Sequence, residues 1–363
     1  MTATTGVRSP RREGLRILDA DAHVVEPGAL FQEWAPPGRA VLDLPATTPI
    51  ELCGDSSRLA DQLEHGFDPP SYLRAMDQQG IDAAVLFPSM GLFVPYLPEL
   101  DGPGAAAACA AYNEWVADYC AAAPQRLAAV GVVPQRDATL AAAEASRAAH
   151  LGLVGVLVRP NHIGPHYLDH HSYDALYGVL AEAGVVLGVH EALGVRAPTI
   201  GRDRFDGFAI RHACSHPLEQ MAAAAAILLG GVCERHPNLR VAFLESGTGW
   251  LPYWLARLDE HRAWMHDTEC ASLSLSPSEY FDRQCVISSD PEDTLAGFVI
   301  RQVGADHVMW ASDFPHPDAA FPDAVEQFLA RLDGIDVDLP RVLWQTPADF
   351  YRLAERFAAA PNR

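Results

Sequence analysis

Eight short apolar runs alternate with longer amphipathic or alanine-rich segments along the whole chain. Each run has the length of a strand and each is followed by a helical segment, so successive strands are expected to pair in parallel through crossover helices. Near-continuous apolar strands suit a sheet that is covered on both faces. The runs span residues 15–21, 81–88, 126–134, 153–160, 184–191, 239–245, 284–288 and 307–313.

This number of strand–helix units in 363 residues predicts one α/β domain, a single (β/α)8 TIM barrel, with a doubly wound open sheet as the alternative. Because 49% of the residues are hydrophobic, the chain can fill a core of that size. The helices are expected over residues 70–79, 104–122, 217–235 and 320–333, with a further one that begins near Ser172.

Three segments are expected outside the barrel itself. Residues 1–14 are polar and predict a flexible N-terminal tail before the barrel domain, residues 15–363. Residues 27–70 follow the first strand and contain many Pro, Gly and Asp, which predicts an insertion that covers the barrel mouth. The last thirty residues are expected to add C-terminal helices.

Composition restricts the class of partner. The net charge of −21 opposes binding to nucleic acid or to an anionic membrane surface. No apolar run reaches the 18 residues that would predict a membrane span. The seven cysteines are scattered, without a Cys-x-x-Cys pair, which favours free thiols in a reducing cytoplasm. A small-molecule substrate is therefore the expected partner.

The chain contains no lysine, since all 26 basic residues are arginine. This absence excludes a pyridoxal-phosphate Schiff base and a Walker-type phosphate site, because both need a lysine amine. It also excludes a pair of metal ions bridged by a carboxylated lysine.

Polar side chains follow several of the predicted strands. In "LDADAHVVEP" the side chains of Asp21 and His23 are two positions apart and share one face of the first strand. His190 ends the fifth strand and Asp313 the eighth. The carboxyl ends of barrel strands meet at one mouth, so these four side chains are expected to share a point. Such a cluster would be costly without a cation, which predicts a divalent metal site.

Each of these residues taken alone has a simpler explanation. An Asp-x-His pair is more often a turn cap or a surface pair, and a single buried histidine such as His190 is more often part of a core. Asp313 could cap a turn before Pro315. The combined pattern on three strands favours the metal site. Two imidazoles with two carboxylates suit zinc, manganese or iron(II), with zinc expected first.

These motifs resemble the metal-dependent amidohydrolase superfamily, and within it the branch of aminocarboxymuconate-semialdehyde decarboxylase and the resorcylate decarboxylases. The segments that carry the resemblance include "LDADAHVVEP", "VLGVHE", "HPLEQM" and "MWASDFPHPD". The resemblance implies a distorted (β/α)8 barrel, one catalytic divalent metal and a homodimer or larger homo-oligomer. It places the metal ligands on Asp21, His23, His190 and Asp313, with Asp21 where many members have histidine.

The sixth strand departs from that branch. Decarboxylases of the branch have a catalytic histidine there, whereas this chain has Glu245 in "LESGTGW". A glutamate beside a metal is expected to be ionised, so it would accept a proton or ligate the metal. His216 is then the candidate replacement acid or base, with a helix N-terminus as the alternative role.

Four further residues are candidates for substrate binding. Arg159, after the fourth strand, could bind a substrate carboxylate or instead pair with an acidic neighbour inside the protein. His212, His316 and Trp250 are placed by the sequence near the mouth, with surface or core roles as alternatives.

The leading functional expectation is a mononuclear metal enzyme that acts at a carbonyl-type carbon of a small, aromatic substrate by hydrolysis or by dehydrative ring closure. In it, Asp313 takes the proton of a metal-bound water, and Glu245 or His216 serves the leaving group. A non-oxidative decarboxylase, with His216 protonating the ring, is the first alternative. A catalytically inactive binding protein on the same barrel is the second.

Overall fold

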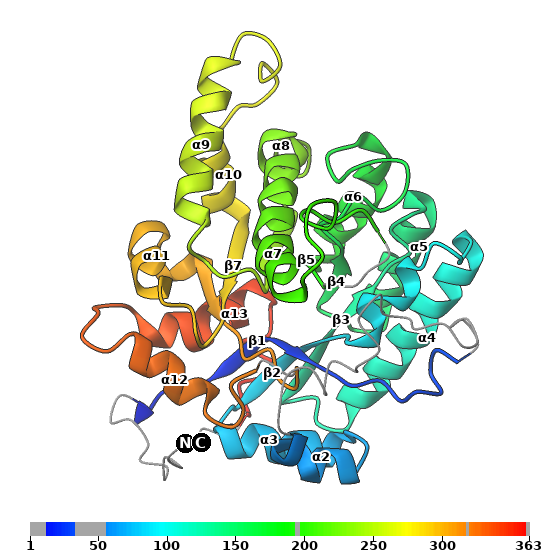
Figure 1. Cartoon of the computed structure of the whole chain (residues 1–363), viewed down its shortest axis with the longest axis vertical. Coiled ribbons are helices and arrows are strands. Elements are labelled where there is room, and N and C mark those ends of the chain that lie inside the picture. The colour runs from blue at the N-terminus through cyan, green and yellow to red at the C-terminus, as the bar shows by residue number, and fades with distance from the viewer. Residues whose placement is uncertain (1–11, 33–55, 193–196, 317–318, 361–363) are drawn as a thin grey trace.

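The computed structural model describes residues 12–32, 56–192, 197–316 and 319–360. Its strands form one parallel sheet in which each strand pairs with the next along the chain, as the alternating pattern predicts (Figure 1). The strands are β1 Leu18–His23, β2 Ala83–Phe87, β3 Leu127–Val132, β4 Gly155–Val158, β5 Val186–His190, β6 Arg240–Leu244, β7 Cys285–Ser289 and β8 Val308–Trp310.

The sheet is nearly closed into a barrel by the segment after β8. The amide of Asp313 donates to the carbonyl of Asp21 at 3.1 Å, and the amide of His23 donates to the carbonyl of Phe314 at 2.6 Å. These bonds bring the end of the last strand beside the first. The predicted (β/α)8 barrel is therefore confirmed, and the doubly wound alternative is excluded.

Helices surround the strands, as Figure 1 shows. The α-helices are α2 Ala60–Glu64, α3 Pro69–Gln79, α4 Gly102–Ala121, α5 Ala138–His150, α6 Asp174–Ala183, α7 Phe208–Ala224, α8 Val232–Arg235, α9 Leu251–Trp264, α10 Pro277–Gln284, α11 Ala296–Val303, α12 Ala324–Arg331 and α13 Thr346–Phe350. Short 3-10 turns are η2 Ser56–Leu59, η3 Met90–Leu92, η4 Val94–Tyr96, η5 His171–Tyr173 and η7 Ala305–His307, and π-turns are η6 Ala225–Leu229 and η8 Arg341–Gln345.

The helix expected over residues 217–235 differs from the observed one. Proline is usually found in the first turn of a helix, because its missing N–H leaves no hydrogen bond unmade there. The observed α7 begins nine residues earlier and contains Pro217. It continues past the proline because its inner face is anchored, with Gln220 Nε2 donating to the carbonyls of Val189 at 2.7 Å and Leu244 at 2.9 Å. The helical stretch is broken at Gly231, which has a φ of 85°.

Two apolar layers hold the barrel together. One lies between the strands and the surrounding helices, and the other fills the barrel interior with residues such as Ala83, Val130 and Met309. The C-terminal segment joins the interior layer, since Tyr351 and Phe357 are buried with those side chains. The predicted C-terminal helices are thus present as η8 and α13.

The predicted tail and insertion fall partly outside the described residues, which do not include 1–11 or 33–55. Arg12 is held against the barrel, because its Nη2 donates to the carbonyls of Gln79 at 2.6 Å and Gly80 at 2.8 Å. The described end of the insertion reaches the segment after β8 through Arg58, which donates to the carbonyl of Phe321 at 3.0 Å.

Two further sequence expectations concern membranes and cysteines. Within the described ranges, no helix combines the length and the apolar character that a bilayer span requires. Six cysteines lie in the same ranges, and all six are free thiols.

Candidate metal centre and active-site cavity

The end of β1 carries two of the predicted ligands on the inside of the barrel. A register shift between Asp19 and Ala22 sets two residues, Ala20 and Asp21, opposite one position of β2. Because of this bulge, Asp21 and His23 both face inward. Asp19 leaves the site and accepts hydrogen bonds from the amide of Ser312, at 3.0 Å, and from its hydroxyl.

The four predicted ligands converge although they come from three strands. His23 Nε2 lies 3.7 Å from Asp21 Oδ1 and 3.3 Å from Asp313 Oδ1. His190 Nε2 lies 3.5 Å from Asp21 Oδ1. Ligand atoms about 2.0–2.2 Å from one ion stand roughly 3.3–3.6 Å apart at the corners of a tetrahedron. The observed separations therefore fit a single ion.

The hydrogen bonds of the two imidazoles leave one lone pair of each free for a metal. His23 Nδ1 donates to the carbonyl of Pro88 at 2.7 Å, and His190 Nδ1 donates to the carbonyl of Glu191 at 2.6 Å. The Nε2 atoms of both, and Asp21 Oδ1, are buried and make no hydrogen bond. Ligating histidines are held by their second nitrogen in this way in metal sites.

The electrostatics of the cluster also favour a cation. Burial lowers the pKa of His190, but Asp21 and Glu245 outweigh it and raise the pKa to about 9. Burial likewise opposes ionisation of Asp313, yet His316 and His23 hold its pKa far below the ordinary range. A divalent ion would supply the positive charge that these carboxylates attract.

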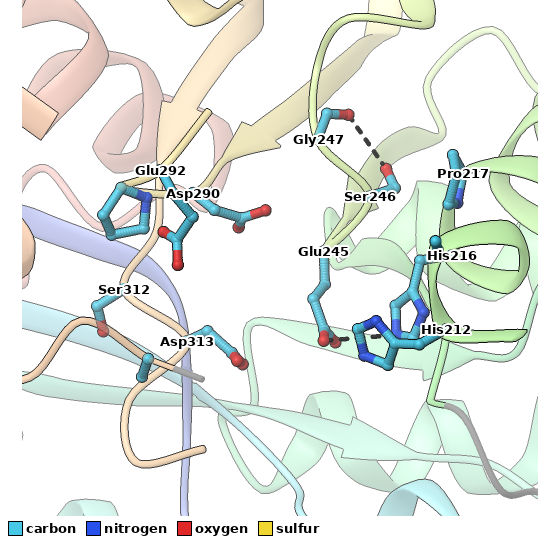
Figure 2. A pocket seen from close by; sticks show the side chains of 13 residues that line it. His212, His216, Pro217, Glu245, Ser246, Gly247, Asp290, Glu292, Ser312 and Asp313 are labelled. Atoms are coloured by element: carbon cyan, nitrogen blue, oxygen red, sulfur yellow. Dashed lines mark hydrogen bonds and ion pairs between the residues drawn. The ribbon is translucent and has the colours of Figure 1, made fainter. Parts of the chain in front are cut away.

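Glu245 joins the ligand cluster to two histidines of α7. Its Oε2 lies 3.4 Å from His190 Nε2. Its Oε1 lies 3.4 Å from His216 Nε2, and Figure 2 shows these two side chains pointing toward each other. The ring of His212 lies 4.4 Å from that of His216. His216 is in the middle of α7 and not at a helix N-terminus, so the alternative role as a cap is wrong.

Two of the carboxylates that follow strands have strained backbones. Glu245 has a φ of 47° and Asp313 a φ of 57°, in the left-handed region. For a residue with a Cβ this conformation costs about 1–2 kcal/mol. Strain of this kind gathers at functional sites, where the surrounding structure holds a side chain in a required direction.

His316 contacts two of the predicted metal ligands and does not line the cavity. Its Nδ1 lies 2.7 Å from Asp313 Oδ1, and its ring stacks on that of His23 at 4.0 Å. Its Nε2 is 3.3 Å from the hydroxyl of Ser89. These contacts hold His316 against the predicted ligands Asp313 and His23.

Arg159, predicted to bind a substrate carboxylate or to pair with an acidic neighbour, is not among the residues that line the cavity. Its side chain is fully buried, and Nη2 donates to Glu191 Oε1 at 3.1 Å and to the carbonyl of Ala192 at 2.6 Å. Its other nitrogens donate to Asn161 and to the carbonyl of Leu92. The guanidinium pairs with an acidic neighbour inside the protein, which was the alternative.

Trp250 does not line the cavity itself. Its indole Nε1 donates to the hydroxyl of Ser246 at 3.2 Å, and its ring packs edge-on against Phe243. Of the four predicted substrate-binding residues, only His212 lines the cavity beside the ligand cluster.

The cavity has a volume of about 330 Å³ and opens beside the metal centre. Its polar lining residues include His212, His216, Glu245, Asp290, Glu292 and Asp313. Asp290 and Glu292, which follow β7, were not among the predicted site residues. The signal was present, since Asp290 comes directly after the seventh apolar run, where a barrel strand delivers side chains to the mouth.

Comparison with known proteins identifies the family. The amidohydrolase family model matches residues 18–353. The chain belongs to the amidohydrolase family. It is 25% identical over 254 residues to 2-amino-3-carboxymuconate-6-semialdehyde decarboxylase of Dictyostelium discoideum, which covers 69% of this chain and 67% of that protein. It is 24% identical over 293 residues to gamma-resorcylate decarboxylase of Polaromonas sp., covering 77% and 86%.

Solved structures show the same fold. A 5-carboxyvanillate decarboxylase of Novosphingobium aromaticivorans, in complex with manganese, superposes with a TM-score of 0.71 at 20% identity and covers 94% of this chain and 97% of that one. A dihydroxybenzoic acid decarboxylase of Polaromonas sp., also with manganese, gives 0.69 at 18% identity and covers 94% and 99%. These neighbours and the ligand cluster support a single divalent metal ion.

This chain is an enzyme of the amidohydrolase fold. The leading expectation of hydrolysis or ring closure is contradicted, because the named relatives and the similar structures are non-oxidative decarboxylases. The reason for the error lies on β6. The glutamate after this strand favoured hydrolysis over decarboxylation in the sequence analysis, whereas α7 places His216 Nε2 3.4 Å from Glu245 Oε1.

Proposed function

We propose that this enzyme is a metal-dependent, non-oxidative decarboxylase of a small aromatic or muconate-type acid. The observation that carries the proposal is the pair formed by His216 and Glu245, which lies directly beside the metal ligand His190. In this proposal, the His216–Glu245 pair provides the proton donor. In the branch that the sequence resembles, a histidine after the sixth strand has this role.

The bound metal would hold the substrate carboxylate and an adjacent hydroxyl, and would be ligated by Asp21, His23, His190 and Asp313. We propose zinc or manganese as the ion. Two imidazoles and two carboxylates accept either, and manganese is the ion in the two similar structures described above.

His216 is assigned the proton transfer. Burial lowers its pKa, but Glu245 outweighs burial and the net pKa is raised, so the imidazolium is favoured. The imidazolium gives its proton to the ring carbon that bears the carboxylate, and a new C–H bond forms. The bond to the carboxylate then breaks, its electron pair returns to the ring, and CO₂ leaves. His216 regains its proton from solvent.

We assign to Glu245 the role of orienting His216 and stabilising its protonated form. A carboxylate next to an imidazolium stabilises the cation and fixes the ring. Despite burial and the charge of Asp313, His216 and His190 lower the pKa of Glu245, so it is ionised at neutral pH and does not act as the acid itself. We further propose a small-molecule substrate and a cytoplasmic homodimer or larger homo-oligomer.

Product analysis tests the proposal. The metal-loaded enzyme is incubated in D₂O with a panel of ortho-hydroxybenzoic acids and with their amides and esters. We expect CO₂ release from an acid and one deuterium at the vacated ring carbon, and no action on the acyl derivatives. Loss of water or of an acyl group without CO₂ would refute a decarboxylase. Tight binding of the panel without any turnover would favour the inactive binding protein.

A further inference from the structure

One amide side chain joins α7 to the two strands that lead to His190 and Glu245. Gln220 Nε2 donates to the carbonyl of Val189 at 2.7 Å and to the carbonyl of Leu244 at 2.9 Å. Val189 directly precedes the predicted metal ligand His190, and Leu244 directly precedes Glu245. The amide therefore bridges the two strand ends from which these functional side chains leave the sheet.

The same amide lies one helical turn from His216. Residues four positions apart lie on one face of an α-helix, and the side chains of His216 and Gln220 are both buried. A shift of α7 along its axis, or a rotation about it, would therefore change the 3.4 Å separation between His216 Nε2 and Glu245 Oε1. The two hydrogen bonds of Gln220 oppose both movements.

The packing of α7 does not by itself require an amide at this position. The next buried residues of the helix, Ala223 and Ala224, belong to the apolar layer between strands and helices. Gln220 is fully buried in the same region, and among the described residues its Oε1 has no hydrogen-bond partner. A buried acceptor without a partner lowers stability. The side chain is thus explained by the two bonds that it donates, which an apolar residue could not make.

We propose that Gln220 is a positioning residue for the proton-transfer pair, and that it sets the distance and the angle at which His216 meets Glu245 beside the metal centre. The part that the pair plays in proton transfer rests on the proposed decarboxylase function. The position of His216 does not rest on it and can be measured without turnover.

Two variants remove the donated bonds without adding a charge, namely Gln220→Met and Gln220→Leu. Gln284→Met is the matched control. Gln284 Nε2 also donates to two carbonyls, those of His236 at 3.0 Å and Leu239 at 2.6 Å, but at the opposite end of β6. The control therefore loses the same two donated bonds at the end of the strand that is remote from His216.

Histidine titration measures the positioning without turnover. In zinc-loaded enzyme with isotope-labelled histidine rings, the resonances of His216 are assigned by their absence from His216→Asn and are followed against pH. Glu245 raises the pKa of His216, whereas the charges of Glu191 and His190 are the same in every variant. If the separation from Glu245 widens by about 1 Å, the midpoint should fall by about 0.8 in pH. We expect this fall in both Gln220 variants and not in the control.

Kinetics then measure what the positioning contributes to the reaction. In both Gln220 variants the kcat for CO₂ release should fall by about 10–100-fold, because a misplacement of about 1 Å can cost that much. Since the metal holds the substrate in the proposed reaction, KM should change less than about threefold. Glu245→Gln should cost about tenfold less in the Gln220→Met background than in the wild type, and the full factor in the Gln284→Met background.

Several results would overturn the inference. They are an unchanged His216 midpoint or an unchanged kcat in both Gln220 variants, and an equal change of either in the control. Failure of both Gln220 variants to fold, while Gln284→Met folds, would also overturn it, because the amide would then serve the whole fold. A lower midpoint in an enzyme whose wild type releases no CO₂ would refute only the proposed function. CO₂ release with an unchanged midpoint would refute only the positioning role.

Discussion

Glu245 and His216 come from different elements, yet Glu245 Oε1 lies 3.4 Å from His216 Nε2. The carboxylate follows β6 and the imidazole stands in the middle of α7, which is held across β5 and β6 by Gln220. In the proposed reaction, the two residues of this pair act together in proton transfer.

The pair should behave as one unit in mutagenesis. His216→Asn and Glu245→Gln are each expected to reduce the rate of CO₂ release by about 10²–10⁴-fold, the usual contribution of a general acid. The double variant should be little worse than either single one, because residues that act as a unit are not additive. Metal content, measured by elemental analysis, should stay at one equivalent. Additive losses would mean that the two residues act independently.

The pH dependence should reveal the same link. Glu245 raises the pKa of His216, so the wild-type enzyme keeps the imidazolium to higher pH. Activity that needs the protonated form is lost as pH rises through that pKa. In Glu245→Gln the raising effect is gone and burial remains, so the alkaline limb of the rate profile should move to lower pH. A limb at the wild-type position, or at higher pH, would remove His216 as the acid.

Metal removal should affect stability as well as turnover. A ligand at a hundred times its dissociation constant stabilises a fold by about 2.7 kcal/mol, so chelation should lower the melting temperature by a few degrees, and one equivalent of Mn²⁺ or Zn²⁺ should restore it. Asp21→Ala should lose the metal, whereas Asp21→His should retain it. Full activity in excess chelator, or two equivalents per chain, would contradict the mononuclear site.

Arg159 should contribute to stability and not to substrate affinity. Arg159→Met leaves Glu191 charged and buried without its partner, which costs about 3–5 kcal/mol in comparable cases. Denaturant unfolding should show this loss, and substrate KM in the surviving native fraction should change little. Arg204→Met removes an exposed arginine and serves as the control, with a change below about 0.5 kcal/mol. A rise in KM without loss of stability would return Arg159 to substrate binding.

The barrel and the convergence of the four predicted ligands follow from the sequence alone. Apolar runs at regular intervals specify parallel strands, because only crossover helices can join them, and the strand ends of a barrel meet at one mouth. Asp21, His23, His190 and Asp313 stand at those ends, so their meeting could be predicted. The prediction of Asp21 and not Asp19 as a metal ligand agrees with the bulge in β1, which turns these two side chains to opposite faces. Simple alternation along a strand would place both on the same face.

The tertiary structure decided what the remaining polar residues do. Arg159 also follows a strand, but its guanidinium nitrogens donate to the carboxylate of Glu191 and to the carbonyls of Leu92 and Ala192. These internal hydrogen bonds occupy the donors that a substrate carboxylate would need. The direction of the His216 side chain depends on where α7 begins and on how the helix is rotated about its axis. Neither can be inferred from the sequence, because α7 contains a proline, which usually marks the start of a helix. Hydrogen-bond partners distant in sequence are set by packing, and local patterns carry no record of them.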